Sequence, residues 1–133
     1  MTELSTIRKQ IFNLNKKRAD MIGSVLNTKP YIAAQVYPRY RKCGKPNCKC
    51  AKGELHGPFL WIYQKKKGQK VISTTVAEGK HTEATELARR YEELLRFRKQ
   101  IREMDQQLNK LLNEFESGLE REVSGYVRKK EEA

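Results

Sequence analysis

Apolar residues recur every three or four positions in the first part of the chain. Between Thr2 and Asn27 they follow one helical stripe, in which the charged residue Arg18 fills the remaining position. Lys29 precedes Pro30, and a residue before proline is pushed out of the helical conformation. The pattern predicts an N-terminal helix within residues 1–28. Its stripe consists of Leu4, Ile7, Ile11, Leu14, Met21 and Val25.

A longer helix is predicted over residues 81–119, where apolar residues follow a seven-residue repeat. Arg98 and Asp105 interrupt this repeat at two seam positions. A heptad repeat of this length is typical of coiled-coil packing, so we expect the two helices to pair antiparallel. The far end of the longer helix is a candidate surface for a second copy or another protein. Residues 120–133 are expected to form a charged tail that frays beyond Gly125. The repeat comprises Leu87, Tyr91, Leu94, Ile101, Leu108, Leu112, Phe115 and Leu119.

The segment between the helices has the composition of β-strands. Pro58–Gln64 and Gln69–Val76 are rich in β-branched and aromatic residues, and the short stretch between them predicts a hairpin. Residues 36–41 are a candidate third strand, which Pro38 would confine to a sheet edge. Alternation places Phe59, Trp61 and Tyr63 on one face, and we expect Trp61 to belong to the core.

The net charge of +12 is concentrated in residues 29–80. This segment has twelve Lys and Arg against Glu54 and Glu78, which gives it a net charge of +10. Charge focused on one short module favours a polyanionic partner. The arginines of the second helix are expected instead to pair with neighbouring glutamates on a solvated face. The candidate nucleic-acid-binding residues are Arg39, Arg41, Lys42, Lys45, Lys49, Lys52, Lys65, Lys66, Lys67 and Lys70.

Neither a membrane span nor an export signal is expected. The chain has no run of about 18 apolar residues. Its first residues lack the basic-then-apolar profile of a secretory signal. We therefore predict a cytoplasmic protein with no membrane partner.

Three cysteines and one histidine lie within fourteen residues. Cys43, Cys48, Cys50 and His56 have the spacing C-x4-C-x-C-x5-H, and zinc accepts such a set in tetrahedral geometry. An odd number of clustered thiols does not favour a disulfide framework. The sequence predicts a closed structural zinc site. Turn-forming residues around it are Gly44, Pro46, Gly53 and Gly57.

Other interpretations of this cluster stay open. The thiols are also compatible with ordinary buried cysteines, an iron–sulfur cluster or transient disulfide chemistry. His81, at the entry of the second helix, is expected to be a solvated neighbour of the helix cap and not a ligand.

With zinc, the sequence predicts an α+β protein in which a long antiparallel, coiled-coil-like helical pair flanks a small zinc-stapled β-hairpin module. The four segments are an N-terminal helix (1–28), a basic Cys₃His zinc and β-hairpin module (29–80), a heptad helix (81–119) and a charged tail (120–133).

The run from Tyr40 to Cys50, followed by Gly53 and His56-Gly-Pro58, resembles a family of short bacterial and archaeal proteins of uncharacterised function. Its members share a C-G-x-P-x-C-x-C…H-G-P core, a strand pair and a heptad-like helix, and are often encoded near transposases or other mobile-element genes. The resemblance covers residues 36–118. It implies that the three cysteines and His56 bind zinc, and it implies a mobile-element setting. The sequence at 59–61 departs from the consecutive aromatic residues of many members.

These observations favour a non-enzymatic accessory protein that binds nucleic acid, with DNA preferred over RNA. The alternative hypothesis is a coiled-coil adaptor that recruits a larger enzyme. An enzyme is the least favoured class, because a four-ligand zinc has no position for water. The basic module also lacks the clustered carboxylates of a metal-dependent nuclease.

Overall fold

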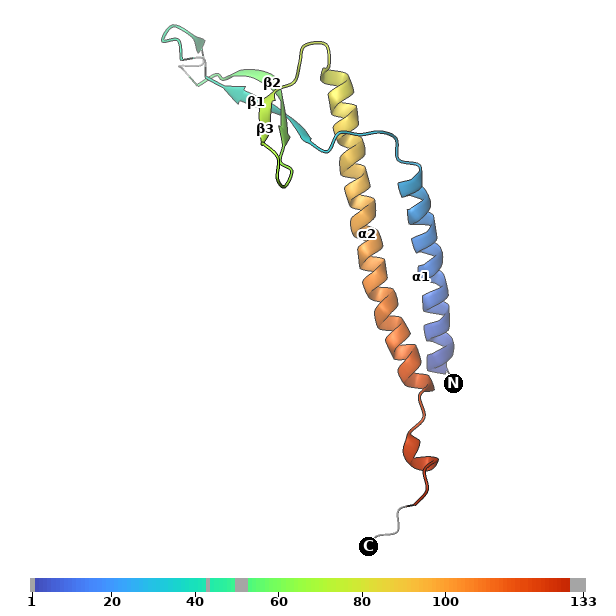
Figure 1. Cartoon of the computed structure of the whole chain (residues 1–133). Coiled ribbons are helices and arrows are strands. Elements are labelled where there is room, and N and C mark those ends of the chain that lie inside the picture. Colours follow the sequence, from blue (N-terminus) through green and yellow to red (C-terminus); the bar gives the residue numbers. More distant parts are fainter. Residues whose placement is uncertain (1, 43, 50–52, 130–133) are drawn as a thin grey trace. The chain divides into compact units, whose positions relative to one another are not determined.

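A computed structural model describes residues 2–42, 44–49 and 53–129 of the chain (Figure 1). It confirms the α+β class, with two helices and a small antiparallel sheet. The described residues form two compact units. One contains the residues up to Leu26 together with those from Phe97 onward, and the other is Asn27–Arg96. The elements are α1 (Thr2–Leu26), β1 (Gln35–Arg41), β2 (His56–Gln64), β3 (Ile72–Thr75), α2 (His81–Leu119) and a short 3₁₀ helix, η2 (Val123–Gly125).

In the first unit, α1 lies antiparallel beside the second part of α2 (Figure 1). The predicted stripe of α1, including Arg18, is half-buried along this contact. On α2, Ile101 is buried with 4% of its surface exposed, whereas Leu112 and Leu119 retain 43% and 48%. Among the described residues no helix is long and apolar enough to span a bilayer. Among the described residues of this helical pair, one seam residue is well buried.

The second unit contains the sheet, whose strand order is β1-β2-β3 with both pairings antiparallel. β1 is therefore an edge strand, as Pro38 predicted. β3 is shorter than the predicted strand, because Gln69 N–H donates to the Lys66 carbonyl at 3.1 Å and Gly68 has a φ of 79°. Gln69, which the sequence pattern assigned to the strand, belongs to this turn, and the strand begins only at Ile72.

The segment before β1 packs along the beginning of α2, within the same unit. Ile32 N–H donates to the Leu87 carbonyl at 3.4 Å, and Arg90 donates to the carbonyl of Pro30 at 2.9 Å. The rings of Tyr31 and Tyr91 stack with centroids 5.4 Å apart. These contacts attach the sheet to the start of α2. Among the described residues of this unit, those that are buried are Ala34, Ala84 and Ala88.

Candidate metal centre and basic surface

Two of the four predicted metal ligands lie together. The Cys48 Sγ atom is 2.8 Å from His56 Nε2, although eight residues separate them in sequence. Cys43 and Cys50 lie outside the described residues. Within the described ranges there is no group of three or more Cys, His, Asp or Glu side chains that could bind a metal. The structure thus brings half of the predicted donor set into one place.

Local backbone geometry brings these two side chains together. Cys48 N–H donates to the Lys45 carbonyl at 3.2 Å, which closes a turn in the loop after β1. His56 begins β2 and is the register partner of Arg41, beside an irregularity in the β1–β2 pairing. Gly57 has a φ of 138°, and a Cβ atom there would lie 2.9 Å from the Arg39 carbonyl oxygen. Only glycine fits this backbone without strain, so the residue next to the histidine is structurally required.

The donor pair suits zinc. Bonds of about 2.3 Å to sulfur and about 2.0 Å to nitrogen in a tetrahedral site hold those two atoms about 3.5 Å apart. The observed contact is shorter than that separation by less than one ångström. The thiolates of Cys43 and Cys50 would complete a Cys₃His set. The chemistry and spacing of the residues therefore fit a zinc ion.

Basic side chains surround this pair. A pocket of about 480 Å³ is lined by Cys48, His56 and Phe59 together with the cations Arg41, Lys42 and Lys45. A Cys₃His zinc site carries a net negative charge, which nearby cations offset, and the same cations favour a phosphate group. The pocket joins the candidate metal site to the basic surface.

Nine of the ten predicted basic residues are described, and all nine are exposed; Lys52 lies outside the described residues. None of the ion pairs among the described residues uses a Lys or Arg between positions 39 and 70. The nine do not form one cluster. Arg41, Lys42, Lys45 and Lys49 lie at the end of the sheet where β1 ends, and Lys65, Lys66, Lys67 and Lys70 lie at the β2–β3 turn (Figure 1). The nine residues of β2 separate these two ends by about 27 Å at roughly 3.4 Å per residue.

One face of the sheet joins the two basic ends. The Arg39 guanidinium carbon lies 4.5 Å from the centre of the Trp61 ring, and that of Arg41 lies 4.7 Å from the Phe59 ring. Trp61 Nε1–H donates to Ser73 Oγ at 2.9 Å. The expectation that Trp61 is core was wrong, because the residue is only half-buried. Sequence reasoning missed these cation–π pairs, although the alternation of Arg and aromatic residues on paired strands was a visible signal.

The arginines at the start of α2 are engaged by acids on the same helix. Arg89 donates to Glu86 at 2.7 Å and to Glu93 at 2.8 Å, as neighbours one turn apart do. The side-chain hydrogen bond with Arg89 lowers the pKa of Glu86 and raises that of Arg89. These arginines are neutralised locally, in contrast to those of the sheet.

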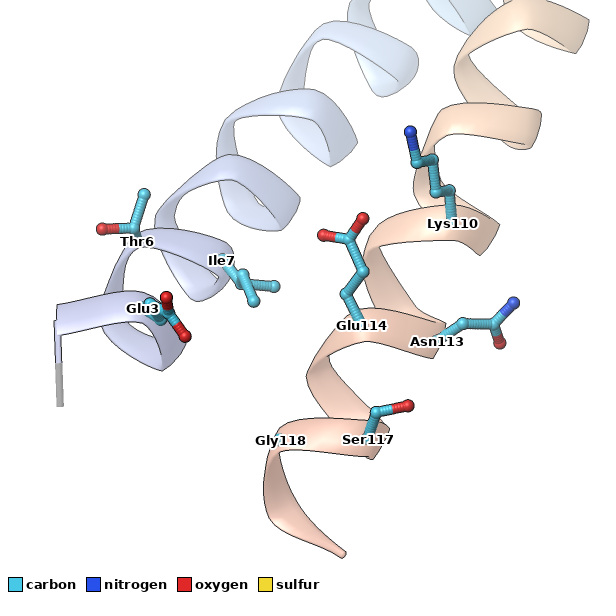
Figure 2. A pocket seen from close by; sticks show the side chains of 8 residues that line it. All are labelled: Glu3, Thr6, Ile7, Lys110, Asn113, Glu114, Ser117 and Gly118. Atoms are coloured by element: carbon cyan, nitrogen blue, oxygen red, sulfur yellow. The ribbon is translucent and has the colours of Figure 1, made fainter.

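A larger pocket, of about 860 Å³, lies between α1 and α2 in the helical unit. Figure 2 shows Ile7 and Glu114 pointing from opposite helices into this space. Its lining mixes acids, a lysine, amide and hydroxyl groups, and it includes none of the predicted site residues. The lining residues are Glu3, Thr6, Ile7, Lys110, Asn113, Glu114, Ser117 and Gly118.

Residues 7–86 match the protein family described as Domain of unknown function (DUF6788). The matched range contains the three strands, the four predicted metal ligands and the ten predicted basic residues, and it ends in the first turns of α2. No curated protein and no solved structure matches the chain. The sheet unit with its candidate site thus falls within the range that the family shares.

Proposed function

The chain belongs to the DUF6788 family, and on that premise we propose that it is a non-enzymatic accessory protein that binds nucleic acid, DNA in preference to RNA, through its sheet unit. The observation that carries the proposal is that the described cations between positions 39 and 70 are exposed and are not paired with acidic side chains among the described residues. Arg39, Arg41 and the described lysines of residues 42–70 are exposed and take part in none of the ion pairs among described residues. Unneutralised cations on a short module attract phosphates and release counterions when they bind.

Zinc has a structural role in this proposal. Cys48 and His56 would bind the ion with Cys43 and Cys50, and a filled Cys₃His site leaves no position for a reacting water. Bound zinc would fix the loop after β1 against the start of β2. Arg41 ends β1, and Lys42 and Lys45 lie in that loop, so all three lie near the candidate site. The metal therefore supports the geometry of one basic end of the sheet.

A second candidate function is that of an adaptor or homodimer formed through the helical unit. Leu112 and Leu119 occupy heptad positions of α2 but keep 43% and 48% of their surface exposed. Exposed apolar seam positions favour a further helical partner. This function is compatible with nucleic-acid binding, and it becomes the preferred one if the sheet unit binds no nucleic acid. The mobile-element setting implied by the family resemblance stays a prediction for either function.

A binding titration tests the proposal. The affinity of the zinc-supplemented full chain for labelled duplex DNA, single-stranded DNA and RNA of equal length is measured by fluorescence anisotropy across a salt series. We expect binding at low salt whose logarithmic affinity falls linearly with the logarithm of salt concentration, at about 0.9 per duplex phosphate contact. An absence of binding to all three at low salt would reject the proposal and favour the adaptor function.

A further inference from the structure

One face of the sheet carries an alternating set of arginine and aromatic side chains that neither zinc binding nor a general phosphate affinity explains. We call it the stacking face, and it consists of Tyr37, Arg39, Arg41, Phe59 and Trp61. Each arginine of β1 lies over a ring of β2, with Arg39 over Trp61 at 4.5 Å and Arg41 over Phe59 at 4.7 Å. Because the rings are two residues apart in β2, both pairs lie on the same side of the sheet.

The outer sides of these pairs are open to solvent. Arg39 and Arg41 are exposed although each covers a ring, and Tyr37 keeps 36% of its surface exposed opposite Trp61. The Trp61 ring is held by its hydrogen bond to Ser73 and by register with β1 and β3. Each planar guanidinium therefore forms a cationic surface over its ring that solvent can reach. Such a surface takes the flat face of a nucleobase, and its edge N–H groups donate to phosphates.

The distance between the two arginine–aromatic pairs indicates whether this face fits a nucleic-acid duplex or a single strand. Side chains two residues apart on one face of a strand lie about 6.8 Å apart. Base pairs in a duplex succeed one another at about 3.4 Å, and their faces are covered by their neighbours. Only bases separated from one another can present their faces at twice that spacing. The stacking face therefore fits an extended single strand.

The stacking face also lies between the two basic ends of the sheet. Lys42 and Lys45 lie beyond one end of β2, and Lys65 and Lys67 lie beyond the other. β2 spans about 27 Å, which corresponds to roughly four extended nucleotides at the spacing given above. Lysines at both ends would bind the backbone that enters and leaves the face.

We propose that the stacking face binds unpaired nucleobases, so that the preferred ligand of this protein is single-stranded nucleic acid lying along β2. This inference rests on the proposed nucleic-acid binding and names its substrate class. Aromatic and arginine stacking is tolerant of base identity, so little sequence preference is expected.

Trp61 is the only tryptophan of the chain, so intrinsic fluorescence reports directly on this face. The zinc-supplemented full chain is titrated with unlabelled oligothymidylate, with oligouridylate and with duplex DNA of the same length. We expect saturable quenching of Trp61 by either single strand and little by the duplex at equal ionic strength. The ratio between the thymidylate and uridylate affinities decides whether DNA or RNA is preferred. Quenching by the duplex that equals quenching by the single strands would overturn the inference.

The matched variants are Arg39→Lys and Arg102→Lys, which both keep the charge and lose the planar guanidinium. Both arginines are exposed, and Arg102 lies on α2 in the helical unit, not in the sheet unit. Arg39→Lys should weaken single-strand binding about five- to tenfold, the loss of roughly one stacked base, and change duplex binding less than about twofold. Arg102→Lys should change neither.

Two failures are distinguishable. If anisotropy shows binding but Trp61 is not quenched and Arg39→Lys binds single strands as wild type does, the stacking face is wrong and the proposed function stands. If no oligonucleotide binds at low salt, the inference and the proposed function fail together.

Discussion

Arg18 of α1 and Asp105 of α2 form an ion pair in the helical unit, and each is a charged residue at an otherwise apolar seam position. The charged residue in the stripe of α1 therefore pairs with one of the two charged residues that interrupt the heptad repeat of α2. Their side chains remain 33% and 49% exposed, so the pair contributes modestly to stability. The pair specifies the register of α1 against α2, because any other alignment of the helices would leave a charge against an apolar stripe.

Reversing one charge of this pair should destabilise the helical unit, and reversing both should restore it. Arg18→Asp places two carboxylates together and should lower the free energy of unfolding by about 1 kcal/mol. The double variant Arg18→Asp with Asp105→Arg should recover most of that loss. Urea unfolding followed by circular dichroism measures both. Lys16→Asp, on the exposed face of α1, is the control. A double variant no more stable than the single one would contradict the assigned register.

Ile101 is the buried residue of the helical seam, with 4% of its surface exposed. Ile101→Ala should cost about 2–5 kcal/mol, because it removes buried methyl groups and leaves a cavity. Glu103→Ala, two positions away and exposed, should change stability by less than about 0.5 kcal/mol. Thermal or urea unfolding of the two variants checks this difference. Equally mild effects would mean that the seam is assigned to the wrong face of α2.

We expect about one zinc per chain, measured by elemental analysis of the purified protein. Cys48→Ser should lose the metal and loosen the start of β2, where His56 lies. The far-ultraviolet signal of the helices should persist in the variant, because α1 and α2 pack through their own seam. Removing zinc from the wild type with a chelator should have the same effect on the sheet. A full zinc content in Cys48→Ser would contradict the site, as would a wild-type sheet that stays folded without metal.

Gly57 can be tested against a second glycine of the same chain. Gly57→Ala forces a side chain into a φ of 138° and to within 2.9 Å of Arg39 O and Tyr40 Cδ1. We expect a loss of about 1–3 kcal/mol in the sheet unit together with weaker zinc binding, because the adjacent His56 is displaced. Gly23→Ala, in the interior of α1 with nothing within 4 Å of the new Cβ, should be neutral or stabilising by up to about 1 kcal/mol. Unfolding curves that rank the two variants equally would contradict this account of the turn.

Much of the fold follows from simple periodicity. The helix α1 ends at Leu26, one residue before the end of the range Thr2–Asn27 that its apolar stripe spans, because Pro30 disfavours its continuation. The helix α2 has the predicted bounds, His81 and Leu119, because the heptad repeat defines it. Pro38 predicted an edge strand because proline cannot donate to a second neighbour. β3 could not be delimited, since the turn at Lys66–Gln69 depends on one hydrogen bond and the conformation of Gly68.

Other features depend on tertiary packing that a pattern of apolar residues does not encode. Ala34, Ala84 and Ala88 form the buried set of the sheet unit, yet small residues give no strong hydrophobic signal. The proximity of Cys48 and His56 was predicted from ligand spacing alone. The division of the basic residues between two ends of the sheet was not predicted, because it follows from the length of β2.

We propose that the sheet unit binds nucleic acid through its own exposed cations. The most direct test replaces Lys65, Lys66 and Lys67 together with Gln and compares this variant with a triple Gln variant at Arg121, Arg128 and Lys129, all six being exposed. Affinity for single-stranded and duplex DNA is measured by anisotropy across a salt series with the full, zinc-supplemented chain. We predict weaker binding to every sequence and a salt slope flatter by up to about three for the hairpin variant, with a much smaller effect for the tail variant. Equal losses from the two variants, or no binding by the wild type at low salt, would contradict the claim.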